Sequence, residues 1–241
     1  MSVSVNKIKK NLRKIREKIS GACKGCGRDP REISMVAVTK TENLETIKNL
    51  LDAGITEFGE NRAKDLAVKS QEFDQYLVRR RKPLTRPVRW HMVGHVQRNK
   101  VKKVVEFAQV VHSVDSLRLA EELEERVRRM NGTMDVMLQV NCSDEPQKYG
   151  CAVGAASHLA ELIASMPGLR LVGLMTMGPL GSGRDETRNS FARLRELFSE
   201  MQDSGIGGSD FRHLSMGMTD DYEMAVEEGA TILRIGRAIF Q

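Results

Sequence analysis

The chain has 241 residues, a net charge of +6 and a hydrophobic content of 40%, which fit an ordinary soluble protein of one large domain or two small ones. No apolar run approaches the length that crosses a bilayer, and the charged N-terminus lacks the apolar core of a signal peptide. The sequence therefore excludes a membrane-spanning protein and predicts a cytoplasmic one.

Much of the excess positive charge lies in two stretches, residues 7–18 and 79–89. A basic surface can attract nucleic acid or phosphate ligands. No nucleic-acid-binding motif accompanies these stretches. We therefore expect a solvated helix face and a solvated loop, and no nucleic-acid or membrane partner.

The first predicted element is an N-terminal helix over residues 1–21 that packs on the rest of the chain. Apolar residues recur there at steps of three and four, as on one face of a helix: Val5, Ile8, Leu12, Ile15 and Ile19. Gly21 is expected to end this helix.

Eight strand-like runs follow, with helical patterns between them. The predicted strands are residues 33–40, 57–61, 89–95, 110–115, 135–141, 170–177, 211–217 and 231–236. The predicted helices are residues 43–54, 62–73, 98–108, 116–130, 154–166, 186–205 and 220–230.

Alternating strands and helices imply a parallel sheet, because each crossover helix returns the chain to the same end of the sheet. Eight such units predict an α/β protein with a single closed (β/α)8 barrel, so that residues 1–241 form one domain. An open doubly wound sheet is the alternative. It is disfavoured because no glycine-rich G-x-G-x-x-G loop follows the first strand.

Polar residues close several of the predicted strands, where barrels of this kind have their active sites. Lys40 shares the parity of Val36 and Val38, and Arg234 shares that of Ile232. If these faces line the lumen, a lysine and an arginine converge near the barrel mouth. A partly desolvated lysine near another cation loses its proton readily and can attack an aldehyde.

Pyridoxal 5′-phosphate is the natural aldehyde cofactor for such a lysine, and it also needs a phosphate site. Residues 214–221 and 234–240 offer one, with Ser215 and Gly236 at the ends of the seventh and eighth strands. Barrels often bind phosphate at the loops after these two strands, through backbone N–H groups at helix starts.

The cysteines do not predict a metal site. Cys23 and Cys26 form a lone C-x-x-C, and Cys142 and Cys151 have poor spacing for a second zinc pair. Reduced thiols are expected.

The histidines do not predict a metal or catalytic site either. His91 and His95 are expected to be packed or capping residues, while His112, His158 and His213 are scattered and offer no triad.

Seven ordered blocks of the chain resemble the pyridoxal phosphate homeostasis protein family. They are "MVAVTKT", "EFGENR", "WHMVGHVQRNK", "VVHSVDS", "LQVN" with "EPQKYG", "LVGLMTMGP" and "LSMGMTDDYEMAVEEGATILRIGRAIF". The resemblance covers roughly residues 5–240. It implies a single barrel related to the N-terminal domain of alanine racemase, with the fold of type III pyridoxal phosphate proteins and no C-terminal β-domain.

The resemblance also implies the cofactor and its binding residues. Pyridoxal 5′-phosphate would be held as an internal aldimine, a Schiff base on Lys40. Arg234 matches an arginine that faces the pyridine nitrogen, and Asn61 matches an asparagine near the cofactor. The matched phosphate-binding positions are Ser215 and the backbone at Met216, Gly236 and Arg237.

The implied function is a non-catalytic carrier in vitamin B6 and amino-acid homeostasis, with apo-enzymes that use pyridoxal phosphate as candidate recipients. The alternative is an amino-acid racemase, which needs a second acid or base opposite the lysine. None of the three tyrosines, Tyr76, Tyr149 and Tyr222, closes a predicted strand. The sequence therefore favours the carrier, and a lone barrel of this kind is expected to be a monomer.

Overall fold

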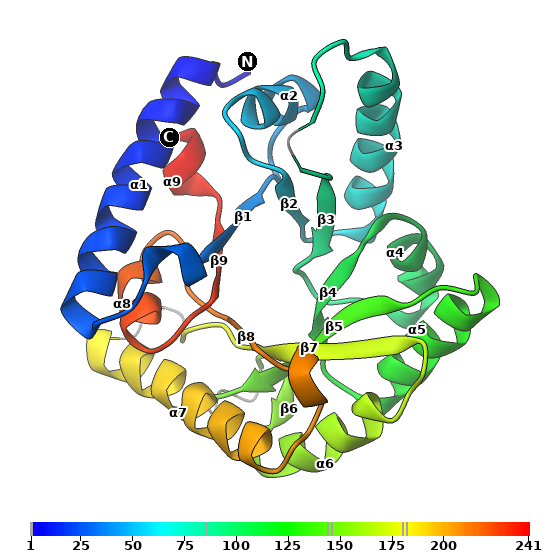
Figure 1. Ribbon diagram of the computed structural model, residues 1–241. Coiled ribbons are helices and arrows are strands. Elements are labelled where there is room, and N and C mark those ends of the chain that lie inside the picture. Colours follow the sequence, from blue (N-terminus) through cyan, green and yellow to red (C-terminus); the bar gives the residue numbers. More distant parts are fainter. Residues whose placement is uncertain (1, 85, 144, 146, 180, 182) are drawn as a thin grey trace.

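Eight parallel strands form a barrel that is surrounded by helices (Figure 1). The computed structural model describes residues 2–84, 86–143, 145, 147–179, 181 and 183–241. The barrel strands are β1 (Ser34–Val38), β2 (Glu57–Glu60), β3 (Arg89–Met92), β4 (Val110–Val114), β5 (Met134–Asn141), β7 (Leu169–Met175), β8 (His213–Ser215) and β9 (Ile232–Ile235). The two-residue strand β6 (Cys151–Ala152) pairs only with the end of β5.

The strands follow one another around the barrel in the order β4-β3-β2-β1-β9-β8-β7-β5, and β5 also pairs with β4. This last pairing closes the ring. All of the pairings are parallel. The predicted (β/α)8 barrel is thus confirmed, and the open sheet is excluded because its two outer strands would not pair.

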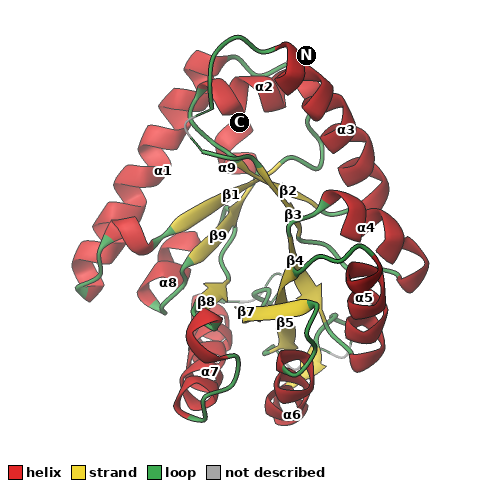
Figure 2. Ribbon diagram, turned by 45° about the vertical axis from the view of Figure 1, so that its right-hand side comes forward, coloured by secondary structure: helices red, strands yellow, loops and turns green. Residues whose placement is uncertain are grey.

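The helices lie outside the strands, as Figure 2 shows. They are α2 (Leu44–Asp52), α3 (Ala63–Arg79), α4 (Val101–Phe107), α5 (Leu117–Arg129), α6 (Val153–Ala164), α7 (Arg184–Asp203), α8 (Tyr222–Glu227) and α9 (Arg237–Phe240). Three 3-10 turns accompany them: η1 (Pro30–Glu32), η2 (Arg98–Lys100) and η3 (Gly208–Asp210).

The N-terminal helix α1 (Val5–Cys26) is longer than predicted. Gly21 lies inside it, because the buried apolar stripe continues to Cys23. The helix ends instead at Gly27, whose φ of 71° lets its N–H cap the Cys23 carbonyl. The predicted end at Gly21 is therefore wrong.

Helix α1 packs against α8 and α9 (Figure 1). The Asn11 side chain donates to the Ile239 carbonyl at 2.9 Å, and Arg28 donates to the carbonyls of Val226 and Ala230. The first and last helices of the chain are thus fixed to each other.

Two apolar layers lie on the two faces of the barrel sheet. The lumen holds a small buried cluster: Val36, Val110, Met137, Val172, Met175 and Ile232. The outer layer, under the helices, includes Phe58, whose ring contacts Phe73 and Trp90. Side chains alternate between the two layers along a strand, and the alternation shifts at the irregularity in β7, where Val172 and Met175 both lie in the lumen cluster.

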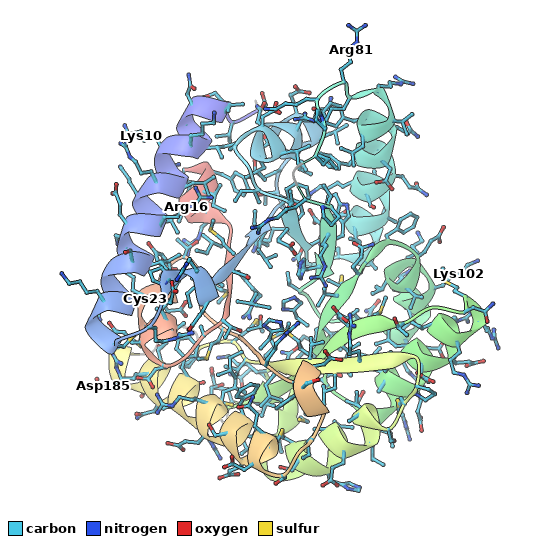
Figure 3. All side chains as sticks on the ribbon, in the orientation of Figure 1. Lys10, Arg16, Cys23, Arg81, Lys102 and Asp185 are labelled. Carbon is cyan, nitrogen blue, oxygen red and sulfur yellow. The ribbon has the colours of Figure 1, made fainter. Side chains whose placement is uncertain are left out.

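The basic side chains of residues 7–18 are exposed on α1, as expected of a solvated helix face. Figure 3 shows Lys10 pointing away from the barrel and Arg81 projecting from the segment after α3. Among the described residues, no helix is both long enough and apolar enough to cross a membrane.

Candidate functional site

Lys40 and Asn61 follow the neighbouring strands β1 and β2. Val38 pairs with Gly59, and the Thr39 N–H donates to the Gly59 carbonyl at 2.8 Å. Two residues further on, this register brings Lys40 level with Asn61 at the C-terminal rim of the barrel. Lys40 lies in a turn and is exposed. The predictions that strand one reaches Lys40 and that its amine is partly desolvated are therefore wrong.

A buried ion pair fixes the backbone just before these two residues. Lys69 of α3 donates to a Glu60 carboxylate oxygen at 2.7 Å and to the Thr39 carbonyl at 2.6 Å. The Thr39 hydroxyl donates to the same Glu60 oxygen at 2.5 Å. Burial raises the pKa of Glu60, while the bonds from Lys69 and Thr39 oppose this rise. These hydrogen bonds fix the C-terminal ends of β1 and β2 relative to each other.

Arg234 of β9 is the buried cation of the lumen, with 4% of its surface exposed. Its guanidinium donates to the Ser215 hydroxyl at 2.7 Å and to the Thr176 carbonyl at 2.8 Å. Burial lowers the pKa of Arg234 to about 10, against the attraction of Asp221. Arg234 is therefore still protonated at neutral pH.

A line of hydrogen bonds continues from Ser215 through the lumen. The Ser215 hydroxyl lies 2.8 Å from Nδ1 of His112, whose Nε2 lies 2.8 Å from Nδ1 of His91. Nε2 of His91 lies 2.6 Å from a Glu57 carboxylate oxygen. Glu57 opens β2, so the line runs from its N-terminal end to the buried guanidinium.

Both linking histidines are buried and held neutral. Burial lowers the pKa of His91, with Glu57 acting in the opposite direction. Burial lowers the pKa of His112 further, and the positive charge of Arg234 acts in the same direction. Each neutral imidazole can donate one hydrogen bond and accept one, so the two rings link their neighbours without adding charge to the lumen.

This line of hydrogen bonds was not predicted from the sequence, where the histidines were taken to be scattered and unconnected. The available signal was parity: His91 lies two residues after Arg89 and His112 two after Val110, on strands predicted to be neighbours. Residues two apart on a strand face the same side, so both rings could have been assigned to the lumen.

Glycines keep the rim clear near the ends of β8 and β9. A Cβ at Gly236 would lie 3.2 Å from the Val38 carbonyl oxygen, two residues before Lys40. Gly217 has a φ of 89°, and its carbonyl accepts from the Arg234 N–H. The backbone is thus bare beside the turn that carries the lysine.

Besides Ser215, two predicted phosphate residues have a group that is already hydrogen-bonded elsewhere. The Met216 N–H donates to the Ile232 carbonyl at 3.2 Å within the sheet. The Arg237 guanidinium is exposed and pairs with Asp220. Arg237 can therefore reach a rim ligand through its backbone, at the first turn of α9.

An aromatic pair lies on the opposite part of the rim. The rings of His95 and Tyr149 stack with centroids 3.8 Å apart, and Nδ1 of His95 lies 3.2 Å from an Asp115 carboxylate oxygen. The Gln139 side chain donates to the Tyr149 carbonyl at 3.0 Å. Although Tyr149 closes no strand, the fold brings it to the C-terminal ends of β3 and β4.

The four cysteines are thiols and lie in two places. Cys23 is buried in the core under α1, and Cys26 is exposed at its end. Burial and the neighbouring Cys142 raise the pKa of Cys151 to about 12. Within the described ranges, no three histidine, cysteine or carboxylate groups gather as metal ligands would.

The chain matches the sequence profile of the family described as alanine racemase, N-terminal domain, over residues 3–241. A protein of Pseudomonas aeruginosa named pyridoxal phosphate homeostasis protein is 38% identical to the chain over 233 residues, which are 97% of this chain and 94% of that protein. The chain belongs to the pyridoxal phosphate homeostasis protein family.

Two solved structures resemble this member of the pyridoxal phosphate homeostasis protein family. An unknown protein from Bifidobacterium adolescentis is 33% identical, with a TM-score of 0.91 over 98% of this chain and 95% of that one. PipY of Synechococcus elongatus, solved with PLP bound, is 29% identical, with a TM-score of 0.82 over 97% of this chain and 100% of that one. These findings confirm the resemblance and the barrel stated from the sequence.

Proposed function

We propose that this chain binds pyridoxal 5′-phosphate and acts in the intracellular homeostasis of this cofactor and of amino acids. The observation that carries the proposal is the 2.7 Å contact of the buried Arg234 guanidinium with Ser215, in the barrel whose rim carries Lys40. The relatives named for pyridoxal phosphate homeostasis and the PipY structure with PLP bound support it.

The residues present fit this cofactor. An amine, a buried cation and an amide at Asn61 suit a ligand that combines an aldehyde, an aromatic ring and an anionic tail. Gly236 forms a cradle, because a Cβ there would crowd the Val38 carbonyl. The bare backbone lets an anion approach the N–H groups of residues 236 and 237.

Each residue has a proposed role. Lys40 would bond to the aldehyde carbon, and its exposure leaves the amine reachable. Asn61 would lie beside the cofactor at the same height. The backbone N–H groups of Gly236 and Arg237 would be the main phosphate donors. Ser215 and Met216 would flank them, since the Ser215 hydroxyl and the Met216 N–H are already hydrogen-bonded within the barrel.

Arg234 would face the cofactor ring and govern its behaviour. Pyridoxal phosphate supplies an electrophilic aldehyde and an electron-accepting ring when it is bound. A fixed cation opposes protonation of a nitrogen beside it, which weakens that ring as an electron acceptor. A weaker electron acceptor favours storage and delivery of the cofactor over catalysis. In this proposal the carrier is a monomer in the cytoplasm, and the recipients are apo-enzymes that use pyridoxal phosphate.

Borohydride trapping tests the proposal. The protein is loaded with pyridoxal 5′-phosphate, reduced with sodium borohydride, digested and analysed by mass spectrometry. The cofactor mass is expected on the peptide that contains Lys40. Lys40→Ala should abolish this mass but keep part of the affinity, whereas Lys64→Ala, which changes an exposed lysine of α3, should keep both. Labelling that survives in Lys40→Ala would refute the assignment.

Racemisation is the second candidate, and the position of Tyr149 is the observation that favours it. Its phenol stacks on His95, which pairs with Asp115, so an acid and a base lie at the rim. Solvent deuterium incorporation at the α-carbon of added amino acids, followed by NMR with the loaded protein, distinguishes the two functions. A carrier incorporates none, whereas a racemase exchanges this hydrogen and loses the activity in Tyr149→Phe.

A further inference from the structure

The lumen contains five side chains in one unbroken hydrogen-bonded line: Glu57, His91, His112, Ser215 and Arg234, here called the relay. Its four links measure 2.6, 2.8, 2.8 and 2.7 Å. The three middle members are at most 3% exposed, and Arg234 is 4% exposed. They come from β2, β3 and β4 on one side and from β8 and β9 on the other, so the line crosses the lumen of the barrel.

The two ends of the relay fix its direction. An ionised carboxylate such as Glu57 can only accept hydrogen bonds, and a guanidinium such as Arg234 can only donate them. A neutral imidazole has one donor nitrogen and one acceptor nitrogen. His91 must therefore donate from Nε2 to Glu57 and accept at Nδ1.

The remaining links follow from the first. His112 must donate from Nε2 to His91 and accept at Nδ1, so the Ser215 hydroxyl donates to His112 and accepts from Arg234. Every link is satisfied once, and both histidines are neutral Nε2–H tautomers. A proton added to either ring would place two donors against each other in this arrangement.

Among the described residues, no carboxylate lies in hydrogen-bonding contact with Arg234, whose guanidinium donates to a hydroxyl and to a carbonyl. A buried charge needs compensation. Chains of hydrogen bonds polarise one another, so a carboxylate can act on a cation through neutral groups. Glu57 is the carboxylate to which this chain of groups leads.

We propose that Glu57, His91 and His112 are positioning residues that anchor the Arg234 guanidinium through Ser215 and fix its orientation from the far end of the barrel. In the relay, the Ser215 hydroxyl donates its proton in a hydrogen bond to Nδ1 of His112. What Ser215 offers Arg234 is then an oxygen lone pair, which holds the guanidinium in the lumen. The orientation itself is a property of the chain alone, and only the affinity readout below rests on the proposed function.

The first test uses the ligand-free protein labelled with ¹⁵N-histidine. NMR at pH 7 should show His91 and His112 as neutral Nε2–H tautomers. A cationic ring, or an Nδ1–H tautomer at either position, would overturn the proposal. Glu57→Gln replaces the obligate acceptor with an amide that can donate or accept, so the His91 and His112 signals should become tautomer mixtures. Glu32→Gln changes an exposed carboxylate in another ion pair and should leave them unchanged.

The second test measures binding of pyridoxal 5′-phosphate by dialysis. His112→Ala should weaken binding about tenfold, the equivalent of about 1.4 kcal/mol for the lost anchor. His112→Gln should recover most of this loss, because its amide can accept from Ser215 and donate to His91. Equal losses in the two variants would refute a hydrogen-bonding role. If the tautomers are as expected but the wild type does not bind the cofactor, the proposed function fails and the relay stands.

Discussion

Lys69 donates to the carbonyl of Thr39 at 2.6 Å, and so a helix on the outside of the barrel holds the residue immediately before Lys40. The same amine neutralises Glu60, which is fully buried. Lys69 of α3 thus supports the rim position of Lys40.

Removing the Lys69 amine should destabilise the fold. Lys69→Met leaves the Glu60 carboxylate buried without its cation, which costs about 3 kcal/mol at pH 7.5 in urea unfolding. Burial already raises the folded-state pKa of Glu60, and loss of Lys69 raises it further. The folded state then takes up a proton before the unfolded chain does, so the deficit should shrink as the pH falls to 5.5. Adding Glu60→Gln to Lys69→Met should recover stability at pH 7.5, and a double variant less stable than Lys69→Met would contradict this account.

Gly217 should tolerate no side chain. A Cβ there would lie 2.5 Å from the Ala225 Cβ, and the φ of 89° disfavours any other residue. Gly217→Ala is expected to cost about 3 kcal/mol, from backbone strain and overpacking together. Gly54→Ala is the matched control, since φ is 90° and no described heavy atom beyond the local chain lies within 4 Å. It should cost about 1 kcal/mol, and equal costs would show that packing against α8 is unimportant.

His112 should make stability depend on pH. Its folded-state pKa lies well below the ordinary value of 6.5, because of burial and of the positive charges of Arg234 and Arg89. As the pH falls through 6.5, His112 becomes protonated in the unfolded chain but stays neutral in the folded protein. This contribution is present above pH 6.5 and is lost below it, by about 1 kcal/mol between pH 6.5 and 5.5. His112→Gln should show a correspondingly shallower fall in urea unfolding, and an identical slope would place the proton elsewhere.

Arg234 should control the cofactor's spectrum more than its retention. Arg234→Met is expected to shift the pH profile of the absorption of bound pyridoxal phosphate, because the fixed cation is gone. Arg237→Met removes an exposed guanidinium that pairs with Asp220, and it should leave the profile unchanged. Identical pH profiles for Arg234→Met and the wild type would show that Arg234 does not act on the cofactor ring.

Much of the fold was predictable because its signals are local. All eight barrel strands were expected within a few residues of where they lie, since each is a short apolar run between helical patterns. The end of α1 was not predicted correctly, because Gly21 is a weak stop signal inside a helix whose buried stripe continues. Four residues past Cys23, Gly27 supplies the left-handed backbone that ends the helix.

The candidate site was predictable only in part. Residues at strand ends, such as Lys40 and Asn61, could be assigned to the rim from topology alone. Contacts across the lumen could not, because Ser215 and His112 are 103 positions apart and meet only when the barrel closes. The exposure of Lys40 also escaped prediction, since it depends on where β1 ends.

The seam between β1 and β9 joins residues 34–37 to residues 232–235. A nascent chain cannot complete this ring until β9 has left the ribosome. Until then β1 keeps one unpaired edge, and the apolar stripe of α1 has neither α8 nor α9 to cover it. Closure of the barrel therefore waits until β9 has been made, and the intermediate before that step exposes apolar surface that chaperones would recognise.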